Sequence, residues 1–322
     1  MDDYNNLLLK TGDMLMLISI ALLSLTVLIY AYLKLTDLQE ICLMHILCGR
    51  ISEFALIQIL FNFNIVSDQD LKCRLCGIMI YFSSIYVYWW LLILTFHIWT
   101  KTSESDITFK RLTWCQLYHL IGTLGPLFCL TVALVAEYHP SEIFDEFRPS
   151  FIEFCWFSGK KTCEVTSCLN GVKIIAGKKE AWIFFYGPVV IILCAILVLS
   201  ICIIRNLSKK PNRPLKSRAC MGAKLNAIMG LLWFMGQIQY KYYEFFERSE
   251  VLKVLFIDIP HILNMLQGWL AFLILVVYRV RIRKLLAQKT FCCYLHFPRS
   301  WTALVDKEME GETEPASSYQ PT

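Results

Sequence analysis

Residues 14–33, MLMLISIALLSLTVLIYAYL, form an uncharged apolar run that decides the fold of this chain. A helix of about 20 residues covers roughly 30 Å, which is the thickness of the hydrocarbon layer of a bilayer. The preceding residues include Asp2, Asp3 and Asp13, whereas a signal peptide has a basic start and a shorter apolar core. We therefore predict that this run is a true membrane span.

The rest of the chain repeats this composition. Of its 322 residues, 57% are hydrophobic and 18% are charged, whereas soluble domains have about 45–50% and about 25%. The apolar residues gather in runs of about 20 or more, long enough to cross the membrane as helices. The sequence predicts an all-α membrane protein, a bundle of seven transmembrane helices at about residues 14–33, 41–65, 75–99, 112–136, 181–204, 219–241 and 254–278.

The distribution of Lys and Arg predicts the orientation. These residues are about twice as dense in segments 34–40, 100–111, 205–218 and 279–289 as in the other connections, and cations favour the cytoplasmic side. We expect a short extracellular N-terminus, residues 1–13, and a cytoplasmic C-terminus. The net charge of +5 then reflects positioning in membrane lipid, and no nucleic-acid partner is expected.

Two segments are expected to follow the last span on the cytoplasmic side. Residues 279–297 are basic and partly amphipathic, and residues 298–322 form an acidic tail that we expect to be disordered. Cys292 and Cys293 lie where reversible palmitoylation is plausible. The third cytoplasmic loop carries a basic group that would face a cytoplasmic partner: Lys209, Lys210, Arg213, Lys216 and Arg218.

Two predicted spans contain polar side chains that need partners in lipid. Arg50 and Glu53 are spaced i, i+3, so they share a helix face as a self-neutralising packed pair, or as a switch or ion path facing a cavity. In the last span, His261, Asn264 and Gln267 fan across one face. They bond neighbouring helices, or form a two-state network beneath a ligand cavity. Span six offers Asn226 as a partner and Gly230 for close approach or a kink.

Five cysteines lie on the predicted outer face, which is an oxidising environment. A bridge between Cys76 and Cys155 would pin the long second outer loop, 137–180, across the bundle. Cys163 and Cys168 could close a small loop. Cys73 is then a free thiol or the alternative partner of Cys155, because sequence does not settle connectivity.

The sequence offers little support for catalysis. Its six histidines show no H-E-x-x-H or comparable metal spacing, and no nucleophile and base can be paired. We expect neither enzymatic activity nor a cofactor or metal.

Five stretches in order resemble the insect Methuselah-like receptors, relatives of the secretin and adhesion G-protein-coupled receptors. They are YVYWWLLILTFHIW (86–99), FCWF (154–157), FFYGPVVII (184–192), LNAIMGLLWFMG (225–236) and LNMLQGWLAFLILVVYR (263–279). The resemblance implies a plasma-membrane receptor that couples an extracellular ligand to heterotrimeric G proteins. It also implies a bridge between Cys76 and Cys155, and matches family positions of the span-three tryptophan, the span-six hinge and the activation network to Trp90, Gly230, Asn264, Gln267 and Gly268.

The chain also departs from that family. Its members carry a cysteine-rich ectodomain, whereas 13 residues precede the first predicted span here. Leu94 and His261 stand where relatives often have acidic residues. The alternatives to a signalling receptor are a non-signalling receptor-like partner subunit or decoy, and, less favoured, a membrane transporter.

Overall fold

The computed structural model describes residues 2–35, 37–62, 71–103, 111–140, 149, 181–209, 222–223, 251 and 254–288. No strand occurs among these residues, as the predicted all-α architecture requires. The elements are α1 (Asp2–Tyr32), α2 (Leu38–Asn62), α3 (Leu71–Thr102), α4 (Arg111–Tyr138), the π-helical turn η2 (Trp182–Tyr186), α7 (Gly187–Lys209), η3 (Val254–Asp258), α10 (Ile259–Met265), α11 (Gln267–Phe272), η4 (Leu273–Val277) and α12 (Val280–Gln288).

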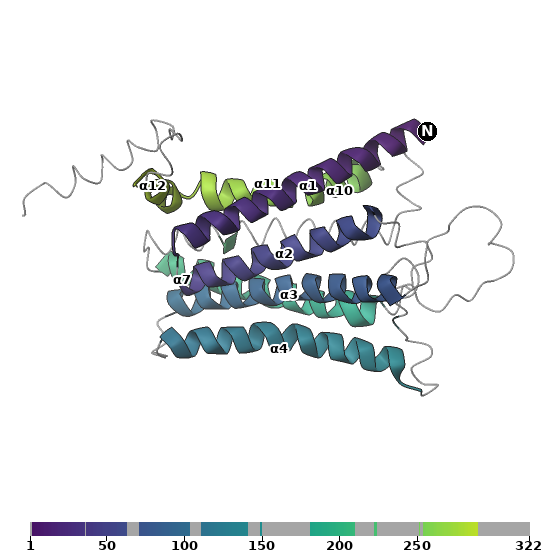
Figure 1. Cartoon of the computed structure of the whole chain (residues 1–322). Coiled ribbons are helices and arrows are strands. Elements are labelled where there is room, and N and C mark those ends of the chain that lie inside the picture. Colours follow the sequence, from purple (N-terminus) through teal and green to yellow (C-terminus); the bar gives the residue numbers. More distant parts are fainter. Residues whose placement is uncertain are drawn as a thin grey trace, which may run out of the picture.

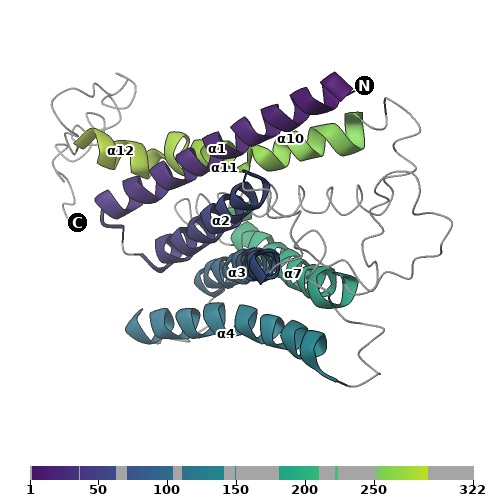
Figure 2. The ribbon, with the colours of Figure 1, turned by 45° about the vertical axis from the view of Figure 1, so that its right-hand side comes forward.

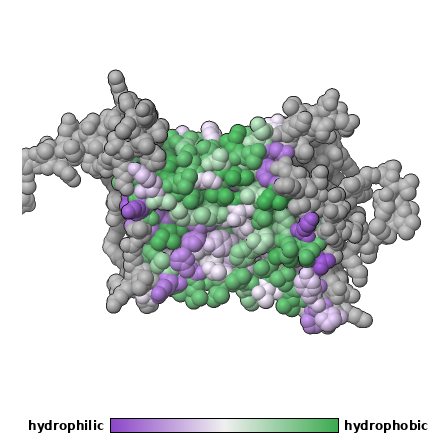
Figure 3. Space-filling model, in the orientation of Figure 1, coloured by the Kyte–Doolittle hydropathy of each residue, from purple (hydrophilic) through white to green (hydrophobic). Residues whose placement is uncertain are grey.

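Within the described parts of the chain, five helices are long and apolar enough to cross a membrane, judged by length and composition, and they match the first five predicted spans. They are Thr11–Tyr32, Leu38–Leu60, Leu71–Thr102, Thr113–Tyr138 and Trp182–Lys209. In Figure 3, hydrophobic atoms cover the middle of the molecule and hydrophilic atoms gather toward its two ends. The predicted sixth span, 219–241, lies almost wholly outside the described residues, so the total of seven remains a prediction.

The helices lie side by side with α3 near the centre (Figures 1 and 2). Helix α3 packs against α2, α4 and α7, while α1 packs against α2 and α11. Helix α4 forms one side of the bundle and α1 with α10 and α11 the other. Helix α12 lies at one end of the bundle, which we call the α12 end, and the N-terminus lies at the opposite end.

Two tryptophans of α3 fit against two glycines of α4. A Cβ added at Gly122 would lie 2.6 Å from an indole carbon of Trp90, and one added at Gly125 would lie 2.6 Å from an indole carbon of Trp89. Small residues let membrane helices approach closely, and here the indole rings occupy the space that the missing side chains leave.

Pro188 explains how α7 begins. Proline has no N–H, so Pro188 cannot donate to the carbonyl of Phe184 four residues earlier. The Tyr81 hydroxyl of α3 donates to that carbonyl at 2.9 Å. The residues just before Gly187 and Pro188 form the π-helical turn η2. A hydroxyl from the neighbouring helix therefore satisfies the group that proline leaves free, as the hydrocarbon interior requires.

Residues 254–278, the predicted seventh span, are helical but do not form one continuous α-helix. It consists of η3, α10, α11 and η4, with an interruption at Leu266, where φ is −83° and ψ is 3°. The bonds from Leu266 N to Ile262 O and from Leu270 N to Leu266 O persist, at 2.9 and 3.0 Å. The interruption is therefore confined to one residue.

Replacing Gly122 with Ala should weaken the contact between α3 and α4. The buried Trp90 ring cannot yield easily, so we expect a loss of about 1–3 kcal/mol of unfolding free energy, typical of overpacking. Thermal unfolding of purified protein in detergent measures the change. Thr123→Ala, at an exposed position one residue away, serves as the control. Equal stability of the two variants would contradict the tight packing.

Candidate functional site: polar clusters inside the helix bundle

The first polar cluster surrounds the interruption at Leu266. The Ser19 hydroxyl of α1 donates to the carbonyl of Met265, and Gln267 Nε2 donates to Asn264 Oδ1 at 2.8 Å. The expected bonds from these two amides to neighbouring helices are not formed, because the i, i+3 spacing lets Gln267 and Asn264 bond each other. The neighbouring helix contributes Ser19 instead. We call this group the hinge cluster.

Gly268 permits this arrangement. A Cβ at Gly268 would lie 2.5 Å from the Ser19 carbonyl oxygen, so α1 and α11 are in backbone contact there. The buried Gln267 Oε1 has no hydrogen-bond partner. An unpaired amide oxygen in an apolar interior costs roughly 1–3 kcal/mol. A second conformation in which this oxygen accepts a hydrogen bond would therefore be favoured by that amount.

The second cluster is the predicted pair of Arg50 and Glu53. Arg50 Nη1 lies 2.6 Å from Glu53 Oε2, and the Ser84 hydroxyl of α3 donates to Glu53 Oε1 at 2.7 Å. The Arg50 guanidinium lies 5.7 Å from the Tyr88 ring centroid. Arg50 is 5% exposed. The self-neutralising packed pair is confirmed, with two side chains of α3 as its further partners.

The third cluster lies at the α12 end, beyond the last span. Arg279 binds Glu40 through both terminal nitrogens, one of them 2.7 Å from Glu40 Oε2, and it donates to the Tyr30 hydroxyl at 2.8 Å. Tyr30 in turn donates to the carbonyl of Leu275 at 3.2 Å. These contacts, which we call the clamp, join the end of α1 and the start of α2 to a segment about 240 residues later in the chain.

The clamp is largely shielded from solvent. The side chain of Arg279 is 10% exposed and that of Glu40 is 1% exposed. Burial by itself lowers the pKa of Arg279, but the hydrogen bond and charge of Glu40 with the Tyr30 hydroxyl outweigh it, so the pKa is raised above its usual value. The contact therefore holds a permanent cation. Arg281 pairs with Asp37 at 2.8 Å on the exposed surface.

Trp90 lies in the fourth cluster and is fully buried. Its indole stacks on His45 of α2 with ring centroids 4.0 Å apart. His119 of α4 meets it edge-on, with centroids 5.5 Å apart. The predicted tryptophan thus joins three helices through aromatic contacts.

The predicted role of Cys76 is wrong. Cys76 is a free cysteine, and its thiol donates to the carbonyl of Leu56 at 3.6 Å. Cys73, three residues earlier on α3, is the disulfide-bonded one. The other seven described cysteines are all free, so the partner of Cys73 lies outside the described residues. Of the two alternatives that the sequence left open for Cys73, the free thiol is excluded, and the bridge to Cys155 stays a prediction because Cys155 lies outside the described residues.

The structure places only part of the remaining predicted residues. The side chain of His261 lies outside the description, although its backbone belongs to α10. Lys209 ends α7 and is exposed. The remaining predicted residues lie outside the described parts of the chain: Asn226, Gly230, Lys210, Arg213, Lys216, Arg218, Cys155, Cys163, Cys168, Cys292 and Cys293.

Sequence reasoning missed the partners more often than the polar residues themselves. Ser19 looks like a small residue in an apolar run, and nothing local points to Met265. Glu40 was assigned to a loop. The contact between Glu40 and Arg279 could have been predicted. An acid at the start of the second predicted span and the cations after the last one are expected at the same face of the membrane.

Searches against models of protein families and against curated proteins find no match to this chain. Among the described residues, no three His, Cys, Asp or Glu side chains are placed to hold a metal ion. The helices and their buried polar clusters define a membrane-embedded helical protein. Its particular activity is a matter for proposal.

Breaking the pair of Arg50 and Glu53 should be costly. Arg50→Met leaves a buried carboxylate without its cation, so we expect a loss of about 3–5 kcal/mol of unfolding free energy. The double variant Arg50→Met with Glu53→Gln should recover most of it. Arg281→Ala at the exposed pair should cost less than about 1 kcal/mol. Unfolding in detergent measures all three, and equal losses for the single and double variants would disprove the coupling.

The cysteine assignment predicts opposite behaviour for neighbouring residues. Cys73→Ser should release one new thiol and cost about 2–4 kcal/mol, typical of losing a native disulfide. Cys76→Ser should leave the bridge intact, because Cys76 is free. Thiol alkylation before and after reduction, read by mass spectrometry, distinguishes them. Release of a new thiol by Cys76→Ser alone would restore the original pairing.

Proposed function

We propose that this chain is a seven-transmembrane receptor of the plasma membrane that passes an extracellular signal to heterotrimeric G proteins. In this proposal the N-terminus is outside and the α12 end is cytoplasmic. The described cations support that orientation, since three lie near the opposite end, Lys10, Lys72 and Arg74. The α12 end carries nine of them: Lys34, Lys101, Arg111, Arg205, Lys209, Arg279, Arg281, Arg283 and Lys284. The resemblance to Methuselah-like receptors agrees with it.

The observation that carries the proposal is the interruption of the last span at Leu266. A receptor needs an element with two arrangements whose balance a ligand can shift. The interruption supplies a bending point, held by the bond from Ser19 to Met265. The unpaired Gln267 oxygen gives a reason for a second arrangement.

The clamp defines what such a change would act on. Arg279 connects the end of the last span to Glu40 and Tyr30, and α12 follows directly. Ile282 and Leu286 of α12 are buried, while Arg281 faces outward. Bending at Leu266 while the clamp stays fixed would move α11 and η4, which lie between the two. The basic surface around the clamp suits a G protein.

A transporter is the second candidate, because transporters often bind substrates where a spanning helix is broken. The hinge cluster has that form. The two candidates differ in their cytoplasmic requirement, since transport needs no G protein.

The test measures basal signalling in cells. The protein is tagged at its N-terminus, surface exposure is checked without permeabilisation, and a panel of G-protein dissociation sensors is recorded. Ser19→Ala removes the bond to Met265, so we expect several-fold higher basal activity. Replacing Lys209, Lys210, Arg213 and Lys216 with Ala should abolish the signal.

Thr26→Val is the matched control for Ser19→Ala. Thr26 is also a buried hydroxyl of α1, but it bonds the Leu22 carbonyl of its own helix at 2.8 Å. Its replacement should leave basal activity unchanged. Surface expression with silence across the panel, in Ser19→Ala as well, would contradict the receptor and favour a non-signalling partner subunit or a transporter.

A further inference from the structure

Four aromatic and imidazole side chains of three helices meet on one side of the bundle. They are His45 of α2, Tyr86 and Trp90 of α3, and His119 of α4. His45 Nδ1 lies 2.7 Å from the Tyr86 hydroxyl, and the His45 ring stacks on Trp90 at an interplanar angle of 11°. The His119 ring meets His45 edge-on, with centroids 4.8 Å apart. We call these four residues the imidazole–indole cluster.

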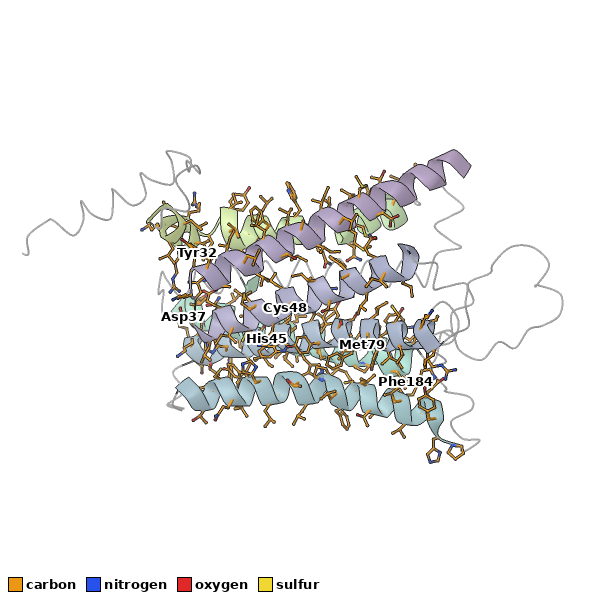
Figure 4. The ribbon with its side chains drawn as sticks, in the orientation of Figure 1. Tyr32, Asp37, His45, Cys48, Met79 and Phe184 are labelled. Atoms are coloured by element: carbon orange, nitrogen blue, oxygen red, sulfur yellow. The ribbon has the colours of Figure 1, made fainter. Side chains whose placement is uncertain are left out.

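The cluster opens toward the lipid. Trp90 forms its buried floor, whereas His45, Tyr86 and His119 are each only partly buried. Cys48, one turn beyond His45, is exposed. In Figure 3 a pale and purple patch interrupts the hydrophobic belt, and Figure 4, in the same orientation, labels His45 and Cys48 in that region.

The cluster lies at one depth in the membrane. His45 is seven residues from the start of α2 at Leu38, and His119 is six residues from the start of the span at Thr113. At 1.5 Å per residue, both lie about 10 Å from the α12 end of their helices. They therefore lie just inside the apolar belt, where water supplies few hydrogen bonds.

Hydrogen-bonding capacity remains unused there. His119 makes ring contacts but no hydrogen bond to a described residue. A neutral imidazole carries one donor and one acceptor, so His45 keeps a second nitrogen beyond its bond to Tyr86. The imidazoles of His45 and His119 therefore keep hydrogen-bonding capacity that the surrounding hydrocarbon cannot satisfy.

An apolar strip continues from the cluster along α3. Phe82 and Met79 follow Tyr86 toward the opposite end at helical spacing. The Phe82 and Tyr86 rings are 5.8 Å apart, and Met79 is 50% exposed. From Trp90 to Met79 the strip is about 16 Å long. Helices α2 and α4 both pack on α3 and flank this strip.

We propose that the strip binds a membrane sterol, with its hydroxyl at the imidazole–indole cluster and its ring system along Phe82 and Met79. A single hydroxyl is donor and acceptor at once, which the cluster needs. The four side chains carry no permanent cation for a lipid phosphate, and an acyl chain has no polar group for them. The apolar side chains along the strip suit the ring system of a sterol, whose tail would point to the bilayer centre.

A photoreactive, clickable sterol analogue tests the site. Purified protein in lipid nanodiscs is labelled, and the modified peptides are mapped by mass spectrometry. We expect labels on α2, α3 and α4 around the strip, competed by excess cholesterol and not by a cholestane that lacks the hydroxyl. His119→Phe keeps the ring and removes its hydrogen bonds, and should weaken competition about five-fold, the equivalent of one hydrogen bond.

Thr131→Val is the matched control on α4. Its hydroxyl bonds the Leu127 carbonyl of the same helix at 2.8 Å at an exposed position, so labelling should not change. Phe82→Ala is a second variant, which should weaken labelling through the ring system while leaving the cluster intact. Size-exclusion profiles confirm that each variant is folded.

Three outcomes would overturn the proposal. They are unchanged competition in both His119→Phe and Phe82→Ala, equal competition by the cholestane, and labels spread over all apolar helices. The readout needs no G protein, so it succeeds or fails independently of the receptor proposal.

Discussion

The structure depends on one constraint, that every backbone polar group in the hydrocarbon interior needs a partner within the protein. Regular helices meet it by themselves. At two departures from the regular α-helix, a hydroxyl from a neighbouring helix donates to a backbone carbonyl: Tyr81 to the carbonyl freed by Pro188, and Ser19 to Met265 beside Leu266. At these two places the local geometry depends on how closely α3 or α1 packs.

The polar clusters divide the bundle into parts with different duties. Arg50 and Glu53 of α2 neutralise each other's charge, and the hydrogen bond from Ser84 to Glu53 joins the pair to α3. The clamp joins the end of α1 and the segment after η4 to α2 around Arg279. The hinge cluster differs, because Gln267 keeps an unpaired oxygen. A bundle that is firm around α3 and at the α12 end, with a bending point between them, is the physical basis of the proposed signalling.

Local spacing predicted the contacts within one helix well. Arg50 and Glu53 are three residues apart, and the pair formed as helix geometry requires. Asn264 and Gln267 have the same spacing and also bond each other, although the sequence predicted bonds to neighbouring helices. Contacts between helices were harder. Cys73 and Cys76 lie one turn apart on α3, so either could face the outer loop, and the sequence favoured the wrong one. His45 and His119 lie far apart in the chain, and no pattern in either helix predicts that they meet.

By itself the sequence determined the all-helical class, the first five spans and the buried charge pair, because apolar length and i, i+3 spacing are properties of a single helix. Only the tertiary structure decided that Glu40 holds Arg279, that Ser19 caps Met265, and that Trp90 rests on Gly122. These contacts depend on which helices are neighbours and how each is rotated. In lipid an apolar residue is tolerated on every face of a helix, so hydrophobic periodicity carries little information about how the helix is rotated. The rotation is determined by small and polar side chains, through the close contacts and hydrogen bonds that they make.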